Sequence, residues 1–231
     1  MSDIADNLQA VQARIQRAAA AAGRPPEAVQ LLAVSKTWPL ASVQAAVAAG
    51  QRAFGENYVQ EGVEKAQATA ALGLEWHFIG PLQSNKTRPV AEHFSWVHSV
   101  DREKIAERLS AQRPPALPPL QVCVQVNVSG EASKSGCAPA ETAALCARIV
   151  ALPQLELRGL MAIPEASDDP AAQRAAFARL RELFDEIRNS LSLPSFDTLS
   201  MGMSHDLEAA IAEGATIVRI GTAIFGERNY A

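Results

Sequence analysis

The sequence predicts an α/β fold, a single (β/α)8 TIM-type barrel over residues 1–231 with an extra helix at its N-terminus. Eight short runs rich in β-branched and aromatic residues alternate with longer amphipathic segments along nearly the whole chain. Strands separated by helices cannot pair as hairpins, so they need crossover connections and a parallel sheet. Eight such strands favour a closed barrel, because no G-x-G-x-x-G follows the first strand to indicate an open dinucleotide-binding sheet.

The elements follow one another in a regular order. The predicted strands cover residues 31–36, 53–57, 76–80, 96–100, 120–128, 157–163, 198–203 and 217–221. The predicted helices lie near 40–50, 58–71, 85–92, 101–112, 139–151, 171–191 and 206–213. Ile4, Leu8, Val11 and Ile15 recur at helical spacing and predict one further helix before the first strand. Asp101 is expected to cap the helix that follows it.

Composition excludes several classes of function. The net charge of −4 and the pI near 5.6 give no basic surface for a nucleic acid. No apolar run approaches the roughly 20 residues that cross a bilayer. The first residues are acidic where a signal peptide is basic, so a cytoplasmic location is expected.

The cysteines and histidines do not predict a metal site. The three cysteines form no C-x-x-C pair, and the four histidines show no metal-ligand spacing. Cys123 and Cys146 fall in apolar strand and helix patterns, so both are expected in the core. Cys137 lies in a Ser/Gly-rich loop and is expected to be exposed.

Lys36 is the first candidate for chemistry. It closes an apolar run that predicts a buried strand, and Pro39 follows shortly after. Burial at the edge of a core disfavours a charged ammonium, and an amine with a depressed pKa can attack an aldehyde to form a Schiff base. The alternative is a lysine that extends its charged end to water from the end of a strand.

Further polar or small residues lie at the C-terminal ends of the predicted strands, where TIM-type barrels place their active sites. The residues at or just after these ends include Lys36, Asn57, Asn127, Met161, Ser200, Ser204, Arg219, Gly221 and Thr222. Ser204 is expected to cap a helix, and Gly221 allows close approach of the backbone. Together with Thr222 they predict a phosphate site after strands seven and eight. The alternative is that Ser204 only caps its helix and Gly221 only turns the chain.

A nucleophilic lysine facing a phosphate site describes a pocket for a phosphorylated aldehyde. Pyridoxal 5′-phosphate (PLP) satisfies both ends, and so does the substrate of a sugar-phosphate aldolase. Arg219 favours the first, because a permanently charged guanidinium beside the pyridine nitrogen would keep that nitrogen unprotonated. Such a contact weakens PLP as an electron sink, which suits most carbanion chemistry poorly.

Long blocks of the chain resemble the pyridoxal phosphate homeostasis protein family. The blocks are Ala33-Val34-Ser35-Lys36-Thr37, Phe54-Gly55-Glu56-Asn57-Tyr58-Val59-Gln60-Glu61, Trp76-His77-Phe78-Ile79-Gly80, Leu82-Gln83-Ser84-Asn85-Lys86, Gly159-Leu160-Met161, Leu199-Ser200-Met201-Gly202-Met203-Ser204-His205-Asp206 and the stretch 219–228. The resemblance covers essentially the whole chain, with less of the pattern in 101–155.

The resemblance implies a barrel similar to the N-terminal domain of alanine racemase. It implies PLP as an internal aldimine on Lys36, with Asn57 beside the cofactor and Met161 near its ring. Ser204, Gly221 and Thr222 would hold the phosphate, with Ser200 added to the cofactor-binding set, and Arg219 would face the pyridine nitrogen.

The function expected from this resemblance is storage, buffering or delivery of PLP without robust turnover. The chain is expected to lack the second domain that gives alanine racemases a catalytic tyrosine, and its own tyrosines are Tyr58 and Tyr230. A weak amino-acid racemase and a Schiff-base aldolase stay open as alternatives. The expected partners are PLP and PLP-dependent apoenzymes, the expected state is a monomer, and Lys134 could supply an amine for release.

Overall fold

Eight parallel strands close into a barrel in chain order, with β1 paired to both β2 and β8. The computed structural model describes residues 3–130 and 135–227. The strands are β1 (Gln30–Val34), β2 (Ala53–Glu56), β3 (Glu75–Phe78), β4 (Trp96–Val100), β5 (Leu120–Gln125), β6 (Leu155–Met161), β7 (Thr198–Ser200) and β8 (Ile217–Ile220). The predicted TIM-type barrel is confirmed.

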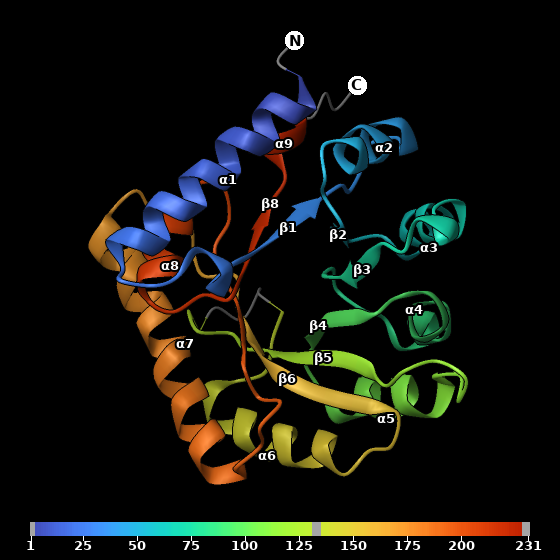
Figure 1. Cartoon of the computed structure of the whole chain (residues 1–231). Helices are drawn as coiled ribbons and strands as arrows, with labels where there is room; N and C mark the ends of the chain where they lie inside the picture. The colour runs from blue at the N-terminus through green and yellow to red at the C-terminus, as the bar shows by residue number, and fades with distance from the viewer. Residues whose placement is uncertain (1–2, 131–134, 228–231) are drawn as a thin grey trace.

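The α-helices surround the barrel and alternate with its strands (Figure 1). They are α1 (Ile4–Ala21), α2 (Leu40–Ala48), α3 (Val59–Ala68), α4 (Thr87–His93), α5 (Glu103–Gln112), α6 (Pro139–Val150), α7 (Pro170–Leu191), α8 (Leu207–Ala212) and α9 (Thr222–Phe225). Short 3-10 helices cover Pro26–Ala28, Ala70–Leu72 and Ser84–Lys86.

The extra N-terminal helix α1 lies along α8 and α9 (Figure 1). Its apolar stripe of Leu8, Val11 and Ile15 is buried, as the helical spacing predicted. Asp3 caps the helix by accepting a hydrogen bond from the backbone N–H of Ala5. The burial of this stripe fixes α1 next to the last two βα loops of the barrel.

Element boundaries differ from the prediction mainly at the C-terminal ends of strands. Lys36 lies two residues beyond the end of β1, and Asn57 lies one residue beyond β2. The predicted cap at Asp101 is wrong, because α5 begins at Glu103 and Asp101 instead forms an ion pair with Arg102. Lys36 and Asn57 are therefore in loops, where their side chains are not constrained by sheet pairing.

All three cysteines are buried. Cys123 and Cys146 lie in the core as predicted. The expectation for Cys137 is wrong: its side chain is 7% exposed and its Sγ lies 3.4 Å from Thr142 Oγ1. The loop that carries Cys137 folds onto β5 through an isolated bridge between Cys137 and Val126, which covers the thiol.

Residues 3–130 and 135–227 offer neither a membrane-spanning helix nor a cluster of metal ligands. Helices in this part of the chain are too short or too polar to span a bilayer. The same residues contain no cluster of three or more His, Cys, Asp or Glu side chains that could hold a metal ion.

Candidate functional site

A cavity of about 180 Å³ opens at the C-terminal ends of the strands. Its lining includes six residues predicted from the sequence, namely Lys36, Asn57, Ser204, Arg219, Gly221 and Thr222. These residues follow or end β1, β2, β7 and β8, so four separate strands bring them together. The prediction that the strand ends converge on one site agrees with this arrangement.

Backbone contacts on both sides of Lys36 hold it at the cavity. The carbonyl of Ser35 accepts a 2.8 Å hydrogen bond from Lys65 Nζ, and the N–H of Thr37 donates a 2.6 Å hydrogen bond to Glu61 Oε1. Thr37 adopts a left-handed conformation with φ of +67°. A threonine is strained there, so the Glu61 contact stabilises a turn that the chain would otherwise avoid.

The same contacts belong to a buried ionic cluster on β2 and α3. Lys65 Nζ lies 2.8 Å from Glu56 Oε1 and 2.6 Å from Glu61 Oε1, and Ser35 Oγ donates to Glu56 at 2.6 Å. Desolvation raises the pKa of Glu56, while Lys65 opposes that shift. Because Lys65 bonds two carboxylates and a backbone carbonyl, the cluster ties α3 to the loop that carries Lys36.

Arg219 is a fixed cation at the base of the cavity. Its side chain extends from β8 and is only 4% exposed. Its Nη1 donates to Ser200 Oγ at 2.8 Å, and its Nη2 donates to the carbonyl of Ala162 at 2.9 Å. Burial lowers the pKa of Arg219 to about 10, so the guanidinium is still charged at neutral pH.

Asn57 brings a buried amide to the cavity. Within the described residues its Oδ1 atom is buried without a hydrogen-bond partner. Its backbone packs so closely against Gly80 that a Cβ at that glycine would lie 2.2 Å from the Asn57 carbonyl. A buried acceptor without a partner costs stability, so Oδ1 is a group that a ligand with a donor could satisfy.

The residues of the predicted phosphate site come from two loops, and Ser204 has a different place in its loop from the one predicted. Ser204 does not cap a helix: Asp206 occupies the N-cap position of α8 and accepts a 2.6 Å hydrogen bond from Met203 N. The Ser204 carbonyl accepts a 2.7 Å hydrogen bond from Arg14 of α1, which holds the loop in place. Ser204 and Thr222 both line the cavity.

Gly221 allows the second loop to approach β1. A Cβ at this position would lie 3.1 Å from the carbonyl of Val34. The residue that follows is Thr222, the first residue of α9, a helix that the sequence did not predict. Hydroxyls and closely packed backbone around a small opening suit an anionic phosphate oxygen.

Two predicted site residues lie below the cavity rather than on its wall. Met161 is fully buried and packs with Trp96 and Cys123 in a core cluster. Ser200 is fully buried and contacts Arg219. Both lie at the ends of their strands with side chains inside the barrel, so Ser200 supports a residue of the cavity.

Sequence reasoning gave no role to several residues that line the cavity. They are Val34, Ile79, Ile163, Met203 and His205. Each lies at or just after the end of a strand, which is the signal that could have identified them. Ile163 is 41% exposed and Met203 37% exposed, so the opening has an apolar rim.

The chemistry of the lining fits a phosphorylated aromatic aldehyde. It supplies an amine at Lys36, hydroxyls at Ser204 and Thr222, a cation at Arg219 and an apolar rim. Lys134, expected as a second amine, lies outside the described residues, as does Tyr230.

Comparison with known proteins places the chain in a family. The model of the alanine racemase N-terminal domain matches residues 7–229. The pyridoxal phosphate homeostasis protein of Pseudomonas aeruginosa is 66% identical over 230 residues, which cover 100% of this chain and 98% of that relative. This chain belongs to the pyridoxal phosphate homeostasis protein family. The resemblance found in the sequence is thereby confirmed.

Solved structures support the same placement within the pyridoxal phosphate homeostasis proteins. PipY of Synechococcus elongatus with PLP bound matches with a TM-score of 0.84 and 39% identity, over 96% of this chain and 100% of that chain. Alanine racemase of Corynebacterium glutamicum matches with a TM-score of 0.70 and 16% identity, over 98% of this chain and 61% of that chain. The racemase likeness is one of fold alone.

Proposed function

We propose that this protein binds PLP covalently through Lys36 and stores, buffers or delivers it without robust turnover. The observation that carries the proposal is the single cavity that joins the Lys36 amine, the Arg219 guanidinium and the hydroxyls of Ser204 and Thr222. A relative of 39% identity with PLP bound supports the choice of this aldehyde over a sugar phosphate.

Each proposed residue has a distinct task. PLP supplies an aldehyde that can be held by an amine and a ring that can accept electrons. The Lys36 amine would hold the aldehyde carbon covalently, with the aldehyde oxygen released as water, and the Ser35 and Thr37 contacts keep the backbone of Lys36 in place. Ser204, Thr222 and the backbone at Gly221 bind the phosphate. Asn57 lies beside the ring and offers its unpaired Oδ1.

Arg219 is the residue that limits turnover in this proposal. A guanidinium donates hydrogen bonds and does not accept them, so it disfavours a proton on a ring nitrogen next to it. With that nitrogen unprotonated, bound PLP would be a weak electron sink, and Arg219 would thereby disfavour turnover. Burial and two hydrogen bonds prevent Arg219 from leaving this position.

Acid–base groups for racemisation are also few in the described part of the cavity. Racemisation needs proton donors and acceptors on both faces of the reacting carbon. Among the described residues Tyr58 is the only tyrosine; it is 57% exposed and does not line the cavity. His205 does line it, so a weak racemase is the second candidate, with His205 as its proton-transfer group.

The first experiment tests Lys36. We expect purified protein mixed with PLP to show an absorption band that borohydride fixes, and peptide mapping to find the label on Lys36. Lys36→Ala should lose the label, whereas Lys86→Ala, which alters an exposed lysine away from the cavity, should retain it. A label at another position, or none, would show that the proposal is wrong.

The second experiment separates a carrier from an enzyme. Loaded protein is incubated with L-amino acids in deuterated water, and exchange of the α-proton is followed by NMR. We expect exchange far slower than enzymatic rates, and steady exchange at about 1 per second or faster would establish a racemase instead. Transfer of the cofactor from loaded monomeric protein to an added apoenzyme would support delivery.

A further inference from the structure

A continuous chain of hydrogen bonds runs inside the barrel from the cavity towards the opposite end. It begins with Arg219 Nη1 and Ser200 Oγ, 2.8 Å apart, and continues from Ser200 Oγ to His98 Nδ1 at 2.7 Å. It goes on from His98 Nε2 to His77 Nδ1 at 2.8 Å and ends from His77 Nε2 to Glu75 Oε1 at 2.7 Å. Ser200, His98 and His77 are all 0% exposed. The chain links β8, β7, β4 and β3.

The donors and acceptors fix the direction of this chain. A guanidinium can only donate, so Ser200 Oγ accepts from Arg219. At the other end a carboxylate can only accept, so neutral His77 donates from Nε2 to Glu75 and accepts at Nδ1 from His98 Nε2. Neutral His98 then accepts at Nδ1, so the proton between them comes from Ser200 Oγ. Every bond therefore points away from the cavity.

The charges at the two ends agree with this direction. Burial lowers the pKa of His77 and lowers that of His98 well below its ordinary value, so both rings are neutral at neutral pH. The hydrogen bond from His77 lowers the pKa of Glu75 to about 2. The chain thus begins at a cation, Arg219, and ends at a carboxylate.

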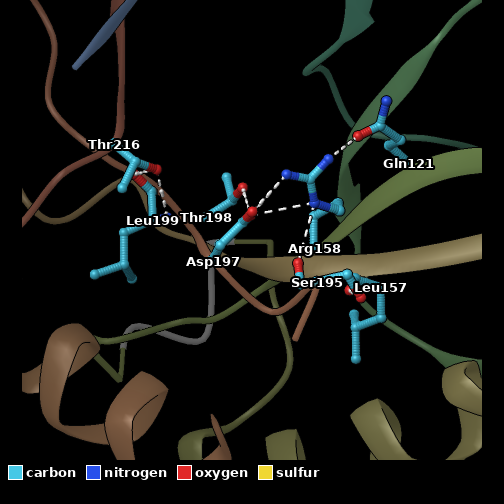
Figure 2. A network of polar contacts seen from close by, with 8 residues as sticks. All are labelled: Gln121, Leu157, Arg158, Ser195, Asp197, Thr198, Leu199 and Thr216. Carbon is cyan, nitrogen blue, oxygen red and sulfur yellow. Dashed lines mark hydrogen bonds and ion pairs between the residues drawn. The ribbon is translucent and has the colours of Figure 1, made fainter. Parts of the chain in front are cut away.

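A second set of contacts holds the rings in place at the N-terminal end of the barrel. His77 stacks on Trp96 with ring centroids 5.2 Å apart, and Arg158 lies over Trp96 at 5.0 Å. Figure 2 shows Arg158 between Asp197 and Gln121. Arg158 Nη2 donates a hydrogen bond to Asp197 Oδ2 at 2.7 Å. This packing leaves His77 little freedom to rotate away from Glu75.

We propose that Ser200, His98, His77 and Glu75 are positioning residues that hold the Arg219 guanidinium in one orientation in the cavity. Glu75, at the far end of the barrel, thereby influences a cofactor that it does not touch. This inference rests on the proposed function where it concerns PLP, and on the hydrogen-bond geometry alone where it concerns the direction of the chain.

The direction of the chain can be tested without PLP. In protein with ¹⁵N-labelled histidine, we expect NMR to show His77 and His98 as neutral rings that carry the proton on Nε2. In Glu75→Leu we expect His77 to be no longer held as a single neutral form with its proton on Nε2. In Glu75→Gln, which keeps an acceptor oxygen, we expect that form to be retained. Glu92→Leu removes a carboxylate that lines the same surface pocket as Glu75 and pairs with Arg88, so it should leave both rings unchanged.

Two results of this first test would overturn the proposal. One is a proton on Nδ1, or a charged ring, at either histidine of the unaltered protein at neutral pH. The other is a Glu75→Leu variant whose rings match those of the unaltered protein. Because Glu75 is partly exposed, with 39% of its side chain accessible, the variant is expected to fold.

The influence on the cofactor is tested with PLP-loaded protein. We expect Ser200→Ala and Glu75→Leu to shift the absorption band of bound PLP while borohydride still labels Lys36. Glu75→Gln and Glu92→Leu should keep the original band. Identical bands in all variants would overturn the positioning role. Failure of the unaltered protein to take up PLP would refute the proposed function instead, and the NMR result would still decide the direction of the chain.

Discussion

At the scale of single residues, the cavity depends on side chains whose partners lie on other strands. Lys36 is placed by contacts of Ser35 and Thr37 with α3, and Arg219 by Ser200 and the carbonyl of Ala162. Such contacts act on position more than on charge. A substitution that keeps the shape of a side chain and removes one polar atom therefore tests a role most directly.

Thr222→Val is such a substitution at the proposed phosphate site. A hydrogen bond to a charged group contributes about 1.5–3 kcal/mol, so we expect affinity for PLP to fall by roughly tenfold to a hundredfold. Absorbance titration measures this affinity. Pyridoxal, which lacks the phosphate, is the control ligand and should bind the variant and the unaltered protein equally. An equal loss for both ligands would contradict a role of Thr222 in phosphate binding.

At the scale of elements, hydrophobic periodicity predicted all eight strands and the helices α1 to α8, with boundary shifts of a few residues. It failed where tertiary contacts decide the structure. Helix α9 has four residues, too few for an amphipathic pattern of its own. It packs against α1, and such a tertiary contact is not visible in the sequence. The prediction that Ser204 caps a helix is wrong, because Asp206 accepts a hydrogen bond from Met203 N and occupies the N-cap position, so that α8 begins at Leu207.

Gly159 is an element-scale feature that decides how β6 pairs with β7. A Cβ here would lie 1.8 Å from the carbonyl of Thr198, its pairing partner. We expect Gly159→Ala to lower the free energy of unfolding by at least about 3 kcal/mol, because the two strands must separate. Gly73→Ala is the control: this glycine has φ of +62° and open space around it, so the cost should be about 1 kcal/mol.

Urea denaturation of the two glycine variants gives the comparison. The strands β6 and β7 end at Met161 and Ser200, so Gly159→Ala should also disturb the support of Arg219. Equal destabilisation by both substitutions would mean that the barrel tolerates a side chain between these strands.

At the scale of the whole molecule, closure of the barrel explains which part of the site the sequence could reveal. Strand ends are visible in a sequence as apolar runs that stop, so six cavity residues were predicted. The buried chain of hydrogen bonds could not be predicted, because His98 and Ser200 are 102 residues apart in the sequence and meet only across the closed barrel. The histidines show no spacing that indicates their contact, and their inward orientation follows from register.

The two buried histidines predict how stability of the whole barrel depends on pH. Their ordinary pKa is 6.5, and burial lowers it in the folded protein. Below pH 6.5 the unfolded chain therefore binds more protons than the folded one, and the free energy of unfolding falls as pH falls. Each histidine contributes a slope of up to about 1.4 kcal/mol per pH unit, until its folded pKa is reached.

Urea denaturation between about pH 7.5 and about pH 5 measures this slope. His98→Asn keeps an acceptor for Ser200 but removes one titrating ring, so its slope should be smaller by about one proton. A stability that does not change over this range, or an equal slope in the variant, would mean that the rings take up protons inside the barrel.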